Sequence, residues 1–183
     1  MTSPMQDLPL DTVSEAEGAP VGFAYEVDGR RVPAERFYAI ACDPARSVAV
    51  EACAGAGKTW MLVSRILRAL LEGVPAHEIL AITFTKKAAG EMRQRLQEWL
   101  RDFSRLDEAG LRKELGLRGL PAARAAELAP VMQGLYAQLL AGGRPVQIRT
   151  FHSWFAALLR TAPLATLEAL GLPARGELLE DDA

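Results

Sequence analysis

Cysteine is nearly missing from this 183-residue chain, which has only Cys42 and Cys53, neither in a CxxC pair. This scarcity argues against a disulfide framework and against a zinc site built on paired cysteines. Long hydrophobic runs are also missing, since a charge interrupts each run well before the roughly 20 residues that span a bilayer. No basic residue precedes Arg30, so the N-terminus does not fit a secretory signal peptide. We therefore expect a cytoplasmic protein without a membrane segment.

The composition is that of an ordinary globular protein. Half of the residues are hydrophobic and 24% are charged, values that exclude a wholly disordered or fibrous chain. The length has room for one domain, or for one domain with a partial companion. No internal repeat is present.

The net charge of -2 conceals an uneven distribution. Residues 1–45 carry 3 basic and 8 acidic side chains, residues 46–160 carry 17 and 10, and residues 161–183 carry 1 and 5. The basic middle is compatible with a polyanionic partner, although an arginine-rich helix face is more often simply solvated. Charge alone leaves both interpretations open.

The N-terminal 46 residues contain few structural signals. Residues 1–20 hold three prolines and no apolar periodicity, which predicts a flexible acidic tail. Residues 21–32 contain the turn dipeptide Asp28-Gly29 between two short extended pieces, which predicts a small hairpin. A short helix after Pro33 is expected to end at Asp43.

Two strand and helix units follow in succession. Residues 47–52 (SVAVEA) predict a buried strand that leads into a glycine-bearing stretch and an amphipathic helix ended by Gly73. Residues 79–84 (ILAITF) predict a second strand, followed by a helix that Thr85 is placed to cap. Residues 103–145 predict short inserted helices, and residues 146–150 a third strand before a last helix. This order indicates an α/β fold with a parallel sheet.

The strongest chemical signal is the stretch between the first predicted strand and helix, ACAGAGKT. It has the form of a phosphate-binding loop: small residues let backbone N–H groups surround the β- and γ-phosphates, Lys58 supplies a mobile charge and Thr59 offers a hydroxyl to Mg²⁺. Ala52 stands where the general pattern has its first glycine. The alternative is a turn that binds nothing, and the loop alone would also suit kinases, GTPases and motor ATPases.

Two further motifs narrow the choice. Residues 83–92 read TFTKKAAGEM and residues 150–153 read TFHS. Together with the AxAGxGKT form of the loop, they resemble the UvrD/Rep-type superfamily 1 DNA helicases, whose motif Ia is usually TFTNKAAxEM, with Lys86 here in place of the asparagine. The resemblance covers residues 33–183. The spacing of about 55 residues between the two motifs is similar to that of the RecB or AddA type.

The resemblance implies a RecA-like P-loop NTPase domain, an α/β fold whose parallel sheet has helices on both faces and carries a helical insertion. Residues 21–102 would be the N-terminal part of motor domain 1A, residues 103–145 a 1B-like insertion and residues 146–183 a truncated return to the motor domain. The domain would be incomplete. Arg36 occupies the place where the family has an adenine-reading glutamine.

The same resemblance implies the site residues and ligands, ATP, Mg²⁺ and single-stranded DNA. Lys58 and Thr59 would act in catalysis, with Thr59 as the Mg²⁺ ligand. The ATP-binding residues would be Ala52, Cys53, Ala54, Gly55, Ala56, Gly57, Lys58 and Thr59. The DNA-binding residues would be Thr83, Phe84, Thr85, Lys86, Thr150, Phe151 and His152.

Physical chemistry supports these roles independently, because hydroxyls and N–H groups at strand ends position phosphates and an aromatic ring stacks on any base. Simpler roles stay open for three of these residues. Thr85 as a helix cap, Phe84 as a core residue and His152 as a hydrogen-bonding residue at a helix start are the alternatives.

The implied function is the N-terminal portion of an ATP-dependent DNA helicase that moves 3′ to 5′ along one strand and unwinds DNA in repair or recombination. Its partners would be single-stranded DNA or a single-to-double-strand junction, and further helicase or nuclease subunits. The acidic Mg²⁺ motif and the second motor domain are missing; residues 178–182 (LLEDD) make a poor substitute because two leucines are a weak buried strand. We expect the fragment alone to be inactive. A non-motor regulatory module and a small-molecule kinase are the alternatives, but a kinase leaves the TFT and TFHS segments unexplained.

Overall fold

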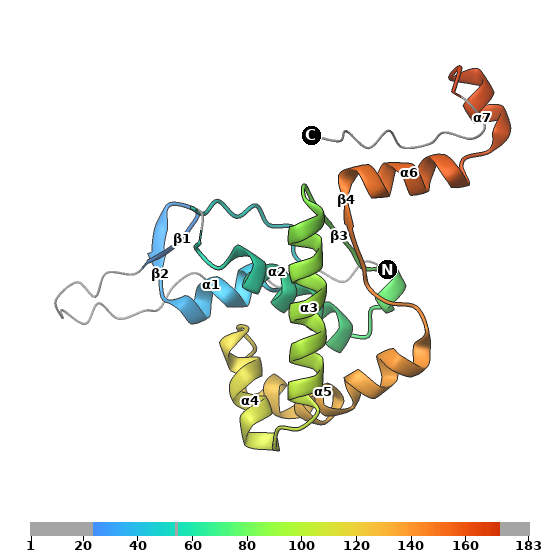
Figure 1. Cartoon of the computed structure of the whole chain (residues 1–183). Helices are drawn as coiled ribbons and strands as arrows, with labels where there is room; N and C mark the ends of the chain where they lie inside the picture. The colour runs from blue at the N-terminus through green and yellow to red at the C-terminus, as the bar shows by residue number, and fades with distance from the viewer. Residues whose placement is uncertain (1–23, 54, 173–183) are drawn as a thin grey trace, which may run out of the picture.

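The computed structural model describes residues 24–53 and 55–172 (Figure 1). The predicted tail over residues 1–20, Ala54 of the loop and residues 173–183 lie outside the described residues. The described chain opens on a hairpin, in which β1 (Tyr25–Val27) pairs antiparallel with β2 (Arg30–Val32). Asp28 (φ 49°) and Gly29 (φ 78°) both adopt the left-handed conformation that a tight two-residue hairpin turn requires. The hairpin prediction is confirmed.

Helices α1 (Ala34–Ala41) and α2 (Lys58–Leu71) follow, and the short η1 (Ala76–Glu78) leads into the sheet. Helix α2 ends where the sequence predicts, since Gly73 has the positive φ of 87° that closes a helix C-terminus. One face of α2 is buried from Met61 to Leu71. This burial holds the helix that carries the predicted phosphate loop firmly in the core.

The sheet consists of two parallel strands, β3 (Leu80–Thr83) and β4 (Gln147–Thr150), paired from Leu80 with Gln147 to Thr83 with Thr150. The connection between them holds α3 (Lys86–Phe103), α4 (Glu108–Leu117) and α5 (Ala122–Gly142). A mixed α/β fold with a small parallel sheet is thereby confirmed. A wider RecA-like sheet with helices on both faces stays a prediction.

The strand expected over residues 47–52 is wrong. This segment has no ladder partner among the described residues, and Val48 is 38% exposed. A β-branched sequence becomes a strand only when a neighbouring strand satisfies its backbone groups. In the described chain β3 pairs with β4 instead, and residues 47–52 reach the loop without regular secondary structure.

The expectation of short helices over residues 103–145 is also wrong for α5, which runs for 21 residues through Pro130. Proline removes one backbone hydrogen bond from a helix and usually ends or bends it. Here the residues around it, Leu128, Ala129 and Met132, are buried in the main core. Their packing outweighs the local cost of the proline.

The main core lies between α2, α3, α4 and α5, and β4 contributes Ile148 to it. The helices of the predicted insertion therefore share one core with the helix of the phosphate loop. Beyond the sheet, α6 (Phe151–Thr161) and α7 (Leu164–Ala169) extend away from this core (Figure 1). Helix α6 buries none of its residues. In the described part of the chain, no helix is both long enough and apolar enough to cross a membrane.

Candidate nucleotide and nucleic-acid sites

The predicted phosphate loop is open at the start of α2. Gly55 and Gly57 both have φ of 80°, a left-handed conformation that other residues adopt only with strain. A methyl group added at either glycine would meet nothing within 4 Å, so the requirement for glycine is conformational. Gly57 is the N-cap of α2 and offers no side chain to the helix. The first N–H groups of α2 are thus available to an anion.

Lys58 lies over this loop. Its Nζ donates to the carbonyl oxygens of Ala52 at 2.6 Å and Cys53 at 2.7 Å. An ammonium group has three donors, so one remains for a further acceptor. Thr59 is half-buried at the next position, in the first turn of α2. The loop therefore combines open N–H groups, a helix N-terminus, a positive charge and a hydroxyl within one short segment.

These groups fit a nucleoside triphosphate better than a metal ion alone. Among the described residues, no group of three or more His, Cys, Asp or Glu side chains is arranged to hold a metal. Mg²⁺ commonly binds through phosphate oxygens, waters and one or two protein ligands. Thr59 would be the ligand from this loop, and the phosphates would supply most of the remaining coordination.

The two threonine-bearing motifs meet at the carboxyl end of the sheet. Thr83 and Thr150 are register partners at the last position of β3 and β4. The next residues, Phe84 and Phe151, have ring centroids 5.2 Å apart. Phe84 is 83% exposed and Phe151 37%, so the alternative of Phe84 as a core residue is wrong. We name the area formed by Thr83, Phe84, Thr85, Thr150 and Phe151 the strand-end surface.

Two of its threonines also begin helices. The Thr85 Oγ1 accepts from the Ala88 N–H at 3.0 Å, which confirms the predicted cap of α3. Thr150 caps α6 in a reciprocal capping box with Ser153, which the TxxS spacing in the sequence could have indicated. Because Thr150 is only 8% exposed, its hydroxyl mainly shapes this surface. The Thr85 hydroxyl is exposed and keeps its proton for an acceptor.

Lys86 and His152, the remaining predicted DNA-binding residues, are both exposed at the first turn of α3 and of α6, respectively. The structure brings both to the side of the sheet where the strand-end surface lies. Whether His152 contacts a nucleic acid or only the start of its helix stays a prediction.

Sequence reasoning missed the buried cationic cluster behind the loop. Trp60 follows Thr59 in α2, and its ring lies 5.8 Å from that of Trp99 in α3. The guanidinium of Arg118 stacks on both indoles and on Phe103, and it pairs with Glu114 at 2.6 Å. Burial lowers the pKa of Arg118, and the hydrogen bond to Glu114 opposes that effect. No local sequence pattern signals such a cluster, since its members come from three helices.

Comparison with known proteins agrees with this arrangement. Several relatives, each named as the A subunit of an ATP-dependent helicase/nuclease, match part of the chain. The protein from Lactobacillus gasseri is 45% identical over 60 residues, which is 33% of this chain and 5% of that protein. The protein from Latilactobacillus sakei is 49% identical over 57 residues, or 31% and 6%. The protein from Streptococcus agalactiae is 52% identical over 52 residues, or 28% and 4%. The matched region is thus a small part of each relative.

A family model gives broader coverage. The model of the UvrD/REP helicase N-terminal domain matches residues 34–168, from the first residue of α1 to the second-last residue of α7. This range includes the phosphate loop, both threonine-bearing motifs and the helices between them. With the loop at the start of α2 and the two motifs paired at the end of the sheet, the chain belongs to the UvrD/REP helicase N-terminal domain family.

Proposed function

We propose that this chain is the ATP-binding N-terminal part of an ATP-dependent DNA helicase. The observation that carries the proposal is the pairing of Thr83 with Thr150, which brings the TFT and TFHS segments together beside two exposed phenylalanine rings. Such a surface suits a single strand, since hydroxyl and N–H groups can hold phosphates and rings can stack on bases without reading sequence.

The phosphate loop supplies the second half of the proposal. The N–H groups at the start of α2 would hold the β- and γ-phosphates of ATP, and Lys58 would move its ammonium from the loop carbonyls toward them. Bound Mg²⁺, with Thr59 among its ligands, would neutralise charge on the phosphates. Hydrolysis also needs a carboxylate that positions the attacking water, and the phosphate loop, residues 52–59, contains no acidic residue. We therefore infer that the chain alone binds ATP without useful turnover.

In the whole protein these parts would drive 3′ to 5′ movement along one strand and unwinding of a junction, as in repair or recombination. The relatives are named as one subunit of an ATP-dependent helicase/nuclease, which supports further helicase or nuclease subunits as partners. Residues 103–145 would form a helical insertion within the motor domain. Their helices pack into the core of α2 and α3, so the insertion would move with the loop as one body.

The test is a paired binding measurement on the 183-residue chain. A fluorescent ATP analogue with Mg²⁺ and a labelled oligo(dT) are titrated separately into wild type, Lys58→Ala and Lys113→Ala. Lys113 is an exposed lysine on α4 and serves as the matched control. We expect Lys58→Ala to weaken nucleotide binding at least about tenfold, about 1.4 kcal/mol, and to leave oligo(dT) binding unchanged.

Each outcome has a defined meaning. Nucleotide binding without oligo(dT) binding would favour a non-motor regulatory module. Equal nucleotide binding by wild type and Lys58→Ala would contradict the assigned role of the loop. In a second variant, Phe84→Ala should weaken oligo(dT) binding by about 1–3 kcal/mol if its ring stacks on a base.

A further inference from the structure

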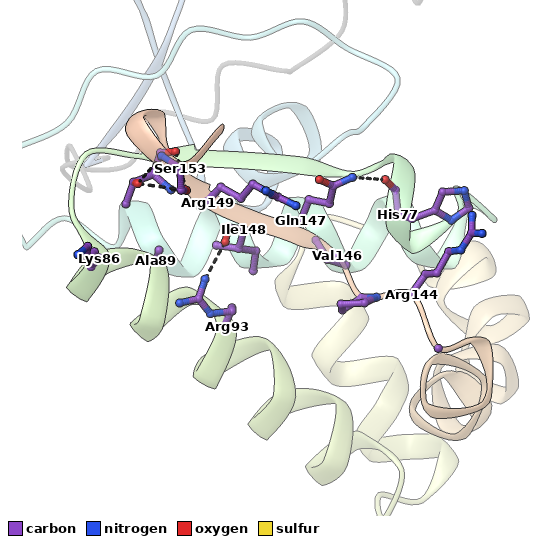
Figure 2. Close-up of a pocket in the computed structure, with 13 residues that line it drawn as sticks. His77, Lys86, Ala89, Arg93, Arg144, Val146, Gln147, Ile148, Arg149 and Ser153 are labelled. Atoms are coloured by element: carbon purple, nitrogen blue, oxygen red, sulfur yellow. Dashed lines mark hydrogen bonds between the residues drawn. The ribbon is translucent and has the colours of Figure 1, made fainter. Parts of the chain in front are cut away.

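A basic groove runs along the outer edge of β4, between this strand and α3 (Figure 2). Its volume is about 660 Å³. Residues 143–150 form one wall, and Lys86, Ala89 and Arg93 of α3 form the other. We name this feature the β4-edge groove. None of its lining residues, all in the described part of the chain, carries a carboxylate.

Basic side chains are spread along its length. Arg93 reaches from α3 toward the strand, while Arg144 and His77 lie at the amino end of β4 (Figure 2). Both Arg144 and His77 are exposed. The guanidinium of an arginine offers five N–H donors in a planar fork that suits phosphate oxygens. The groove is therefore chemically matched to an anion with several phosphates.

The edge of β4 is blocked against another strand. The Arg93 Nη1 donates to the carbonyl oxygen of Ile148 at 2.7 Å, and the Thr150 N–H donates to the Ser153 Oγ at 3.0 Å. Pro145, two residues before the strand, has no N–H to offer. Edge strands closed in this way do not extend a sheet. These contacts therefore oppose the addition of a β-strand at two positions of the edge, and they favour an occupant that binds through the cationic side chains.

The floor of the groove is held in place. The Gln147 side chain donates to the carbonyl oxygen of His77 at 2.8 Å, which ties η1 to the start of β4. One nitrogen of Arg93 is fixed on Ile148, so the side chain is oriented while its other N–H groups remain to bind an anion. Less conformational entropy is lost when a ligand meets side chains that are already ordered.

The groove opens onto the strand-end surface. Thr150 and Ser153, which shape the start of α6, also line the carboxyl end of the groove. Arg144 lies at the opposite end, beyond the amino end of β4 (Figure 2). A strand held at the strand-end surface would therefore find a continuous basic path along β4.

We propose that the β4-edge groove binds the phosphate backbone of a single nucleic-acid strand and extends the strand-end surface toward Arg144. This inference rests on the proposed function, because it assigns a further segment of the same path. Binding in this segment involves phosphates only. It should lengthen the bound strand and raise the salt dependence without adding sequence preference.

The test measures the binding of labelled oligo(dT) of about 4 and about 16 nucleotides, a range that covers typical single-strand site sizes. Affinity is followed over a series of salt concentrations for wild type, Arg144→Ala and Arg93→Gln, which removes the charge of Arg93 and keeps a polar side chain. Arg105→Ala is the control, since this exposed arginine lies past the end of α3, and the helix from Arg93 to Phe103 alone spans roughly 15 Å. Thermal unfolding by circular dichroism verifies that each variant folds.

For the longer oligonucleotide, we expect Arg144→Ala and Arg93→Gln each to weaken binding about fivefold at low salt. Each should also reduce the slope of log K against log salt by about 0.7 for every phosphate that the variant no longer neutralises. The shorter oligonucleotide should be unaffected by Arg144→Ala. If Arg93→Gln does not fold, the result for Arg144→Ala alone tests the inference.

Three results would overturn the inference. If both variants match Arg105→Ala on the longer strand, the groove does not bind it, although the proposed function stands. If inorganic tripolyphosphate binds with the same dependence on Arg144 and displaces no oligonucleotide, the groove is a site for free phosphates. If no oligonucleotide binds wild type even at low salt, the DNA-binding part of the proposed function fails and this inference fails with it.

Discussion

The guanidinium carbon of Arg118 lies 4.3 Å from the ring centroid of Trp99. Arg118 follows the last residue of α4 and is only 1% exposed, whereas Trp99 lies in α3. The same guanidinium is 5.2 Å from the ring of Trp60, the residue after Thr59 of the phosphate loop. This stack joins the predicted insertion to the first turn of α2. Substitution of Arg118 should therefore also alter the packing next to the phosphate loop.

We predict that Arg118→Ala lowers the free energy of unfolding by about 3–5 kcal/mol, because it removes a buried cation from its partner Glu114 and from three rings. The measurement is urea unfolding followed by tryptophan fluorescence. Arg112→Ala is the control, since Arg112 pairs with Glu108 at the same spacing on the surface of α4 and should cost less than about 1 kcal/mol. If both variants lose the same free energy of unfolding, the burial of Arg118 does not contribute to stability.

The turn after Arg118 packs directly against α1. Gly119 has φ of 79°, and a Cβ there would lie 2.2 Å from the backbone nitrogen of Ala39. Gly119→Ala should therefore cost about 3 kcal/mol or more, from both backbone strain and overpacking. Gly73→Ala isolates the strain, because Gly73 has φ of 87° with open space around it, and should cost about 1 kcal/mol. Chemical denaturation of both variants tests the difference; similar losses would show that the close approach to α1 is unimportant.

The two thiols should differ in reactivity. Cys53 is exposed in the phosphate loop, whereas Cys42 is buried beneath α2. We expect a thiol-specific disulfide reagent to modify Cys53 quickly in the native chain. In urea, the reagent should modify both thiols quickly. An ATP analogue with Mg²⁺ should slow the fast reaction by covering the loop. Cys53→Ser should abolish it, and a fast reaction that survives this change would mean that Cys42 is accessible.

Stability should fall at alkaline pH because of Cys42. Burial raises the pKa of this thiol from 9.0 to about 11. Above pH 9 the unfolded chain loses a proton that the folded chain retains, so the stabilising effect is complete below pH 9 and is lost as the pH rises to 11, with a total of about 3 kcal/mol. Tyr38, with its pKa raised to about 12 by burial and a hydrogen bond with Tyr25, acts in the same direction at higher pH.

The measurement compares the free energy of unfolding at pH 8 and pH 10.5 in wild type, Cys42→Ala and Cys53→Ala. Between pH 8 and pH 10.5, the free energy of unfolding should fall less in Cys42→Ala than in wild type. This comparison holds whatever the stability of Cys42→Ala at pH 8. Cys53→Ala is the matched control, because it removes the exposed thiol and leaves Cys42 in place. If the free energy of unfolding falls as much in Cys42→Ala as in wild type, groups other than Cys42 cause the loss of stability at alkaline pH.

Local elements and motifs of this chain were predictable because each depends on neighbouring residues. Asp28-Gly29 specifies a tight turn, Thr85 caps the helix that follows it, and the glycines of the loop allow the left-handed conformation at the start of α2. Apart from residues 47–52, the order of the strands also follows from short-range patterns, and so does the family, which the three motifs identify.

Tertiary structure decided the other features of the fold and the site, because they depend on contacts between residues far apart in the chain. The sequence of residues 47–52 has strand character, but no neighbouring strand among the described residues pairs with it. Pro130 would end an isolated helix, but burial of the residues around it carries α5 through. The pairing of Thr83 with Thr150 and the stacking of Arg118 on Trp99 join segments that only the packing of helices around the parallel pair brings together. Sequence by itself determined which chemical groups this protein has, and tertiary packing determined which of them share a surface.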